Sequence, residues 1–127
     1  MSVHKFYCLN ARGKGEAIRY LLHLNDVQFE DARFTKEQWQ EWKAANIHRL
    51  VFGQMPLLEI DGQMLEQSIA LVRYLGNKYG YYGRTKWEAG RIDMLIDGYS
   101  DLLAARINPL IQSKVFHNPA YDMVCSG

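Results

Sequence analysis

The spacing of apolar residues constrains the fold most, because within residues 1–80 it alternates between the period of a strand and that of a helix. Residues 3–9 are short and β-prone and lead into a loop at 10–13. Apolar residues in 15–25 recur at helical spacing, with Glu16 in the first turn, where the helix dipole favours an acid. Residues 27–34 alternate like a second strand. This order predicts a β-α-β unit.

The next segment adds a helix, a hairpin and a further helix. Thr35 followed by Gln38 is a capping-box pattern that predicts a short helix over 36–45, and 46–53 is expected to be loop. Residues 55–65 predict a hairpin with Asp61-Gly62 as its two-residue turn, and a helix should resume at about Gln67. The resulting fold class is α/β, with a thioredoxin-like N-terminal domain of order βαβαββα.

A change of pattern near residue 80 predicts a domain boundary. The Gly80–Arg84 segment interrupts the helical spacing, and the longest helix starts at Trp87 with an apolar stripe spaced like a buried seam. We expect residues 1–80 to form the thioredoxin-like domain, 81–86 a linker and 87–127 part of an all-α domain. Asn108-Pro109 and Asn118-Pro119 disfavour a continuous helix, so a frayed tail is expected.

Charge and cysteine content limit the partners. Fifteen Lys and Arg stand against fourteen Asp and Glu with the signs interspersed, so we expect neither a nucleic-acid nor a membrane partner. Only Cys8 and Cys125 occur, which indicates a reducing compartment, and no signal peptide is visible, so the cytoplasm is expected. The four histidines lack ligand spacing, and no metal is expected.

Four short motifs, in this order and spacing, carry a family resemblance. They are Asn10-Ala11-Arg12-Gly13-Lys14, Phe52-Gly53-Gln54-Met55-Pro56, Gln67-Ser68 and Ile92-Asp93-Met94-Leu95-Ile96-Asp97. Across most of residues 3–112 the chain resembles the cytosolic glutathione transferases, most of all the sigma class. The resemblance implies a homodimer that binds glutathione as co-substrate in the thioredoxin-like domain and a small hydrophobic electrophile against the helical domain.

The resemblance also implies where glutathione binds. Gln67 and Ser68, at a helix N-terminus, would cradle the γ-glutamyl carboxylate, although a serine there can equally be a simple helix cap. Pro56, preceded by Gln54 and Met55, is similar to the family's cis-proline, which turns the Met55 main chain so that it pairs with the cysteinyl unit. An ordinary strand-initiating proline is the alternative.

Further positions follow from the same resemblance. Trp39, Lys43 and Lys14 are similar to residues that hold the glycyl carboxylate and the peptide backbone. Asp97 matches an acid that reaches the glutamyl ammonium bound by the neighbouring subunit. Phe52 matches an aromatic key that enters the partner subunit, but packing on its own core is equally compatible with the sequence.

One position departs from the family pattern. Most alpha, mu, pi and sigma members carry a tyrosine two residues before the Asn-x-Arg-Gly position, where its hydroxyl stabilises the glutathione thiolate; here that residue is Cys8. Tyr7 should point to the opposite face of a regular strand, and only a bulge or a one-residue slip would aim it at the sulfur. Alternatively, Cys8 and Tyr7 are both packing residues.

The expected activity is conjugation of reduced glutathione to hydrophobic electrophiles, or isomerisation of a lipid peroxide, with Tyr7 or Cys8 near the sulfur. The family's helical domain continues beyond the length of this chain, and its further helices would complete the electrophile pocket and bury the apolar seam of the longest helix. Here we expect that seam to stay partly exposed. A catalytically weak or inert glutathione-binding protein is therefore the alternative. A thiol-disulfide oxidoreductase that uses Cys8 is a third hypothesis.

Overall fold

A four-stranded mixed sheet organises the molecule in the computed structural model, which describes residues 1–11 and 13–104. The strands are β1 (His4–Leu9), β2 (Phe29–Phe34), β3 (Leu57–Ile60) and β4 (Gln63–Glu66), in the order β2-β1-β3-β4. β1 pairs with β2 in parallel and with β3 antiparallel, and β3 and β4 form the expected hairpin. The crossover from β1 to β2 needs a helix between parallel neighbours, and α1 supplies it.

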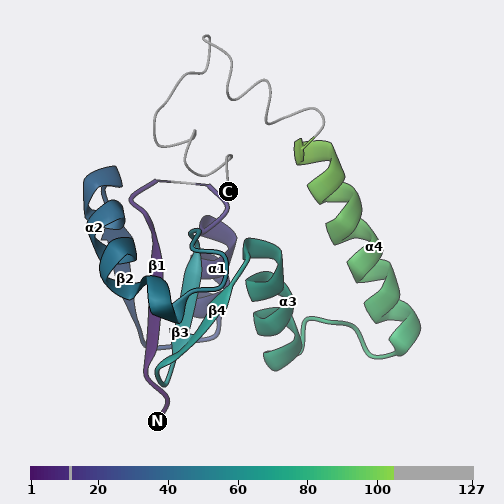
Figure 1. Ribbon diagram of the computed structural model, residues 1–127. Coiled ribbons are helices and arrows are strands. Elements are labelled where there is room, and N and C mark those ends of the chain that lie inside the picture. Colours follow the sequence, from purple (N-terminus) through teal and green to yellow (C-terminus); the bar gives the residue numbers. More distant parts are fainter. Residues whose placement is uncertain (12, 105–127) are drawn as a thin grey trace.

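Helices cover both faces of this sheet (Figure 1). α1 (Glu16–Leu24) and α3 (Ser68–Lys78) pack on one face, and α2 (Lys36–Asn46) lies on the other. The capping box at Thr35 and Gln38 forms as predicted. The element order confirms the thioredoxin-like α/β fold, with small shifts at the boundaries.

Two cores result from the alternation of side chains across the sheet. The α1 and α3 side is largely aliphatic, and its fully buried members are Phe6, Ile18, Leu22, Leu58, Leu71 and Leu75. The α2 side is aromatic: Tyr7 and Trp39 pack there with the partly buried Phe34 and Trp42. Because Leu57 and Leu58 are neighbours, β3 contributes one residue to each core.

One segment differs from the sequence-based expectations, and another forms where it was expected. The stretch expected to be loop contains a short 3-10 helix, η1 (Ile47–Arg49). α4 (Lys86–Leu102) forms where the longest helix was predicted, and none of its residues is buried. In Figure 1 it lies apart from the sheet, beyond α3. The frayed tail predicted after Asn108 lies outside the described residues.

Candidate functional site

β1 sends Tyr7 and Cys8 to opposite faces of the sheet. Its register with β2 and β3 runs residue by residue through both positions, without a bulge or a slip. Tyr7 consequently joins the aromatic core under α2, and Cys8 joins the aliphatic core under α1 and α3. Because the strand is regular, the Tyr7 side chain does not reach the face of the sheet that carries Cys8.

The Tyr7 hydroxyl is bound to a carboxylate. It donates to Glu59 Oε2 at 2.6 Å, and Arg49 from η1 donates to Glu59 Oε1 at 2.9 Å. Glu59 stands opposite Lys5 in the sheet, so the hydroxyl points back toward the start of β1 and away from the β1–α1 loop. Burial and the Glu59 contact raise the pKa of Tyr7, which keeps this phenol protonated.

Cys8 is a buried thiol, 3% exposed. A Cβ built on Gly15 would lie 2.5 Å from the Cys8 Sγ, so the sulfur is packed against the residue that precedes α1. Burial raises the pKa of the thiol, with Arg19 acting in the opposite direction. A thiol in this setting is a packing group and a poor source of thiolate.

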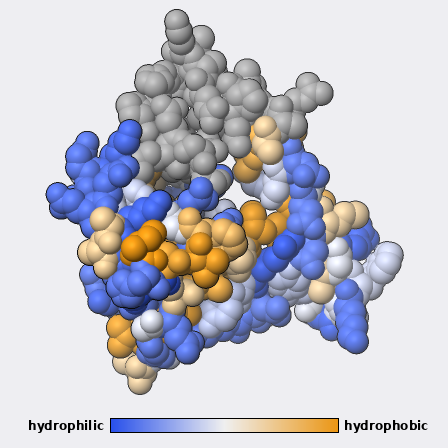
Figure 2. Space-filling model, in the orientation of Figure 1, coloured by the Kyte–Doolittle hydropathy of each residue, from blue (hydrophilic) through white to orange (hydrophobic). Residues whose placement is uncertain are grey.

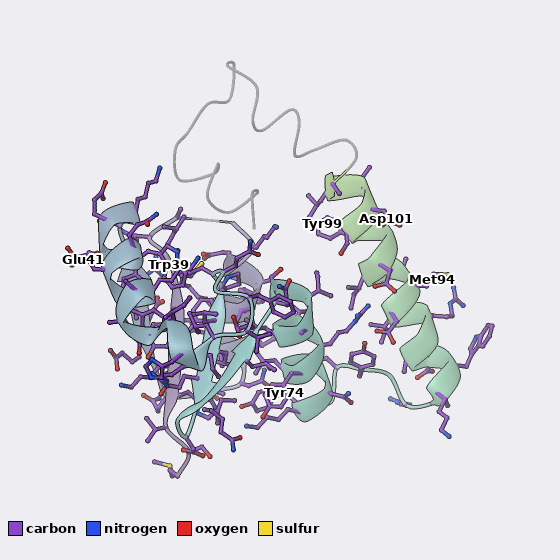
Figure 3. All side chains as sticks on the ribbon, in the orientation of Figure 1. Trp39, Glu41, Tyr74, Met94, Tyr99 and Asp101 are labelled. Atoms are coloured by element: carbon purple, nitrogen blue, oxygen red, sulfur yellow. The ribbon has the colours of Figure 1, made fainter. Side chains whose placement is uncertain are left out.

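α2 places a cation beside the loop that leads into β3. A Cβ built on Gly53 would lie 3.0 Å from Lys43 Cε, so the lysine stem crosses that glycine, whose φ of +68° favours glycine. Trp39 anchors the helix to the sheet, because its ring lies 6.0 Å from that of Phe34 on β2 and the residue is 5% exposed. Figure 3 shows Trp39 on the sheet side of α2 and Glu41 on the outer side.

Residues 54–56 connect Gly53 to the start of β3. Gln54 is exposed, Met55 is half-buried, and Pro56 is buried at the start of β3. The Met55–Pro56 peptide bond is cis, as the family resemblance implies. Lys43 and the main chain around Met55 are thereby brought to the same end of the sheet.

α3 begins at this end of the sheet with an open N-terminus. Gln67 is its N-cap residue, and no side chain in the described part of the chain caps the helix there. Ser68 is the first helical residue, half-buried. The first amides of an α-helix lack intrahelical partners, and together with the helix dipole they favour a bound anion.

The three remaining predicted site residues are Lys14, Phe52 and Asp97. Lys14 is half-buried in the β1–α1 loop. Phe52 is 62% exposed, and Ile47 and Val51 are exposed nearby, where Figure 2 shows apolar side chains gathered on the face that carries the loop before β3. Asp97, on α4, forms an ion pair with Arg73 of the same chain.

Two charged residues that the sequence analysis did not select shape the site. Arg19 is 2% exposed and donates to the carbonyls of Leu9 and Ala11, at 3.1 and 3.3 Å, which fixes the start of the β1–α1 loop. Glu66 accepts the backbone N–H groups of residues 51–53. Their sequence signals were weak, because a charged residue on a helix or hairpin is usually solvated; for Glu66 the one pointer was its place beside Gln67-Ser68.

Two further features of the described residues concern metal ligands and helix length. No group of three His, Cys, Asp or Glu that could hold a metal ion occurs among residues 1–11 and 13–104. Within the same residues, no helix has both the length and the apolar character needed to cross a membrane.

Comparisons with known proteins identify the family. The model of the glutathione S-transferase N-terminal domain matches residues 4–77. Glutathione S-transferase 2 of Caenorhabditis elegans is 42% identical over 100 residues, covering 79% of this chain and 51% of that protein. Human hematopoietic prostaglandin D synthase is 36% identical over 104 residues, covering 82% and 50%. A solved Nu-class enzyme from Haemonchus contortus matches with a TM-score of 0.73 at 42% identity, over 81% of this chain and 48% of that one.

The similarity covers most of this chain and about half of each relative. The chain spans about half the length of the curated relatives it matches. The residues matched by the family model, 4–77, run from the start of β1 to the penultimate residue of α3. The chain belongs to the glutathione S-transferase family.

Proposed function

We propose that this chain binds reduced glutathione at the end of the sheet where α2, the loop before β3 and α3 meet. The observation that carries the proposal is the open N-terminus of α3 at Gln67 and Ser68, next to the loop that Lys43 crosses at Gly53. Glu66, the residue before Gln67, accepts the Gly53 N–H at 2.9 Å and so joins the two. A helix N-terminus and a lysine suit the two carboxylates of a small peptide.

Each site residue has a proposed task. The α3 amides and the Ser68 hydroxyl hold the γ-glutamyl carboxylate, with Gln67 beside them. The main chain of Met55, oriented by Gln54 and Pro56, pairs with the cysteinyl unit. Lys43 and Lys14 bind the glycyl carboxylate, and Trp39 offers its indole N–H in addition to anchoring α2.

The proposed reaction is conjugation of glutathione to a hydrophobic electrophile, or isomerisation of a lipid peroxide such as a prostaglandin. In the conjugation the thiol loses its proton, the sulfur forms a bond to an electrophilic carbon, and the leaving group departs with its electron pair. Enzymes of this kind favour the thiolate by donating a hydrogen bond to it. Here the Tyr7 hydroxyl is bound to Glu59 and the Cys8 thiol is buried.

The Tyr7–Glu59 hydrogen bond and the burial of Cys8 support a second candidate function, which is glutathione binding without efficient catalysis. A glutathione-binding protein with weak or no transferase activity needs the cradle and does not need a donor at position 8. The thiol-disulfide oxidoreductase hypothesis gains nothing from the structure, because a 3% exposed thiol with a raised pKa is a poor nucleophile.

The assembly is part of the same proposal. We place the chain in a sigma-like homodimer in the cytoplasm, with a role in detoxification, in which Phe52 enters the partner and Asp97 reaches the glutamyl ammonium bound by the partner. The exposure of Phe52 supports its role. The proposed domains remain 1–80 and 87–127, joined by the linker 81–86.

Calorimetric titration of glutathione into the full chain, followed by an aryl-halide conjugation assay, tests this function. Lys43→Gln should weaken binding about tenfold, because a charge-assisted contact to a carboxylate is lost. Lys36→Gln, on the exposed first turn of the same helix, is the matched control and should bind normally. Absence of binding by the unmodified chain would refute the proposal.

The conjugation assay separates the two candidates. Binding with turnover supports the transferase, and binding without turnover supports the inert protein. If a Tyr7→Phe, Cys8→Ala double variant retains full turnover, neither residue acts on the sulfur.

A further inference from the structure

Glu66, the last residue of β4, makes a set of contacts that the family motifs do not include. Its Oε2 accepts the Val51 N–H at 2.6 Å. Its Oε1 accepts the N–H groups of Phe52 at 3.0 Å and Gly53 at 2.9 Å. One carboxylate therefore satisfies three consecutive main-chain donors, and hydrogen bonds to an ionised acceptor are among the stronger ones in proteins.

The same residue also holds the far end of this loop. In the β3–β4 hairpin Glu66 stands opposite Leu57, which directly follows Pro56. The side chain of Glu66 thus fixes residues 51–53, and its main chain fixes the residue just after 54–56. The segment that presents the Met55 main chain is held on both sides by one residue.

The residue that follows Glu66 has an uncommon backbone conformation. Gln67 has a φ of +77°, in a backbone region that residues other than glycine rarely adopt. Such a conformation persists where surrounding contacts fix the chain on both sides. Glu66 supplies them on the N-terminal side, and α3, which starts at Ser68, supplies them on the other.

We propose that Glu66 is a positioning residue that sets the loop 51–56 and the N-terminus of α3 in the relative orientation that binds glutathione. The inference rests on the proposed function and deepens it, because it names a residue that couples the two halves of the cradle without contacting the ligand.

The charge of Glu66 has to be separated from its contacts. The γ-glutamyl end of glutathione carries both a carboxylate and an ammonium, so removing a nearby negative charge does not by itself have one expected sign on binding. Loss of the loop contacts should weaken it. In Glu66→Gln the amide –NH₂ replaces one acceptor oxygen and faces a backbone N–H, so the three contacts cannot all be retained. Glu66→Asp keeps the charge and withdraws the carboxylate, so weaker binding in that variant cannot be a charge effect.

The experiment uses the full chain and its Glu66→Gln and Glu41→Gln variants. Glu41 is an exposed carboxylate on the outer side of α2, which makes it a matched control for the change in charge (Figure 3). Amide hydrogen exchange of residues 51–55 reports on the loop, and calorimetry at a temperature where each variant is folded reports the Kd for glutathione. Glu66→Asp, which keeps the charge and withdraws the carboxylate by one methylene, is measured in parallel and replaces Glu66→Gln if that variant does not fold.

We expect Glu66→Gln to speed exchange at 51–55 and to raise the Kd about tenfold, the Asp variant to change in the same direction, and Glu41→Gln to match the unmodified chain. Faster exchange with an unchanged or lower Kd would overturn the positioning role, and unchanged exchange would show that Glu66 does not hold the loop. If the unmodified chain does not bind glutathione, the proposed function fails, whereas normal binding by Glu66→Gln leaves that function intact and removes this inference alone.

Discussion

α3 and α4 carry similar apolar patterns and have opposite environments. α3 buries Leu71 and Leu75 completely against the sheet and α1. α4 buries none of its residues, and Trp87 and Leu95 are 76% and 68% exposed. Met94 and Tyr99, labelled in Figure 3, lie on this separate helix. Helical spacing thus predicts an apolar stripe, but packing against the sheet and α1 decides whether that stripe is buried.

The polar contacts differ between the two regions in the same way. Inside the sheet domain, Tyr7, Glu59 and Arg49 form a network in which Tyr7 is nearly inaccessible to solvent. Between α3 and α4, Arg73 pairs with Asp93 and Asp97, whose side chains are 42% and 66% exposed. Contacts of the first kind should stabilise the fold, and contacts of the second kind should chiefly orient α4.

The largest effect expected from this comparison is on the core of α3. Leu71→Ala should lower the free energy of unfolding by about 3 kcal/mol, because it removes fully buried methyl groups and leaves a cavity. Leu95→Ala, the same change on α4, should cost less than about 0.5 kcal/mol. Urea unfolding followed by circular dichroism measures both. Equal losses in the two variants would mean that α4 buries its stripe in solution, and the contrast between the helices would be wrong.

Most of the fold could be predicted, because it depends on local signals. The change from strand to helical spacing, the Thr35 and Gln38 capping box and the Asp61-Gly62 turn each specify one element, and all of them are confirmed. Residues 47–49 were expected to be loop, since a single 3-10 turn has no period that a sequence can reveal.

The candidate site was less predictable, because its geometry depends on contacts between distant residues. Gln67 and Ser68 are recognisable from their motif, whereas Glu66 acts on amides that lie 13 to 15 positions earlier. The opposite orientation of Tyr7 and Cys8 followed from strand alternation. The binding of the Tyr7 hydroxyl to Glu59 did not, because the register of β1 and β3 cannot be read from either strand alone.

A second variant tests the buried polar network. Tyr7→Phe removes the hydroxyl and leaves Glu59 with one donor fewer in a partly buried place, so it should cost about 1.5 kcal/mol. Tyr81→Phe removes a hydroxyl that donates to Asn25 at 3.1 Å on an exposed side chain and should cost less than about 0.5 kcal/mol. Chemical denaturation measures the pair. A Tyr7 variant as stable as the unmodified chain would show that Arg49 alone satisfies Glu59.

The pH dependence of stability tests whether the Glu59 carboxylate stabilises the sheet domain. Burial acts to raise the pKa of Glu59, but the hydrogen bonds from Tyr7 and Arg49 outweigh it and leave the pKa below its ordinary value. The stabilisation is therefore fully present above the ordinary glutamate pKa and is lost as the pH falls through the lowered value. Thermal melts from neutral pH downward should show a smaller acid-induced fall in Tm for Glu59→Gln than for the unmodified chain. Parallel curves would exclude this carboxylate as a source of the acid sensitivity.

The smallest effect on stability is expected for Arg73→Gln, which removes both ion pairs between α3 and α4. Pairs between exposed groups are screened by salt and contribute little to folding, so the urea midpoint should not change measurably. Amide exchange in α4 should nevertheless become faster, because these ion pairs link the helix to α3. A large shift in the urea midpoint would contradict this, since it would mean that α4 unfolds together with the sheet and that its placement depends on more than surface charge.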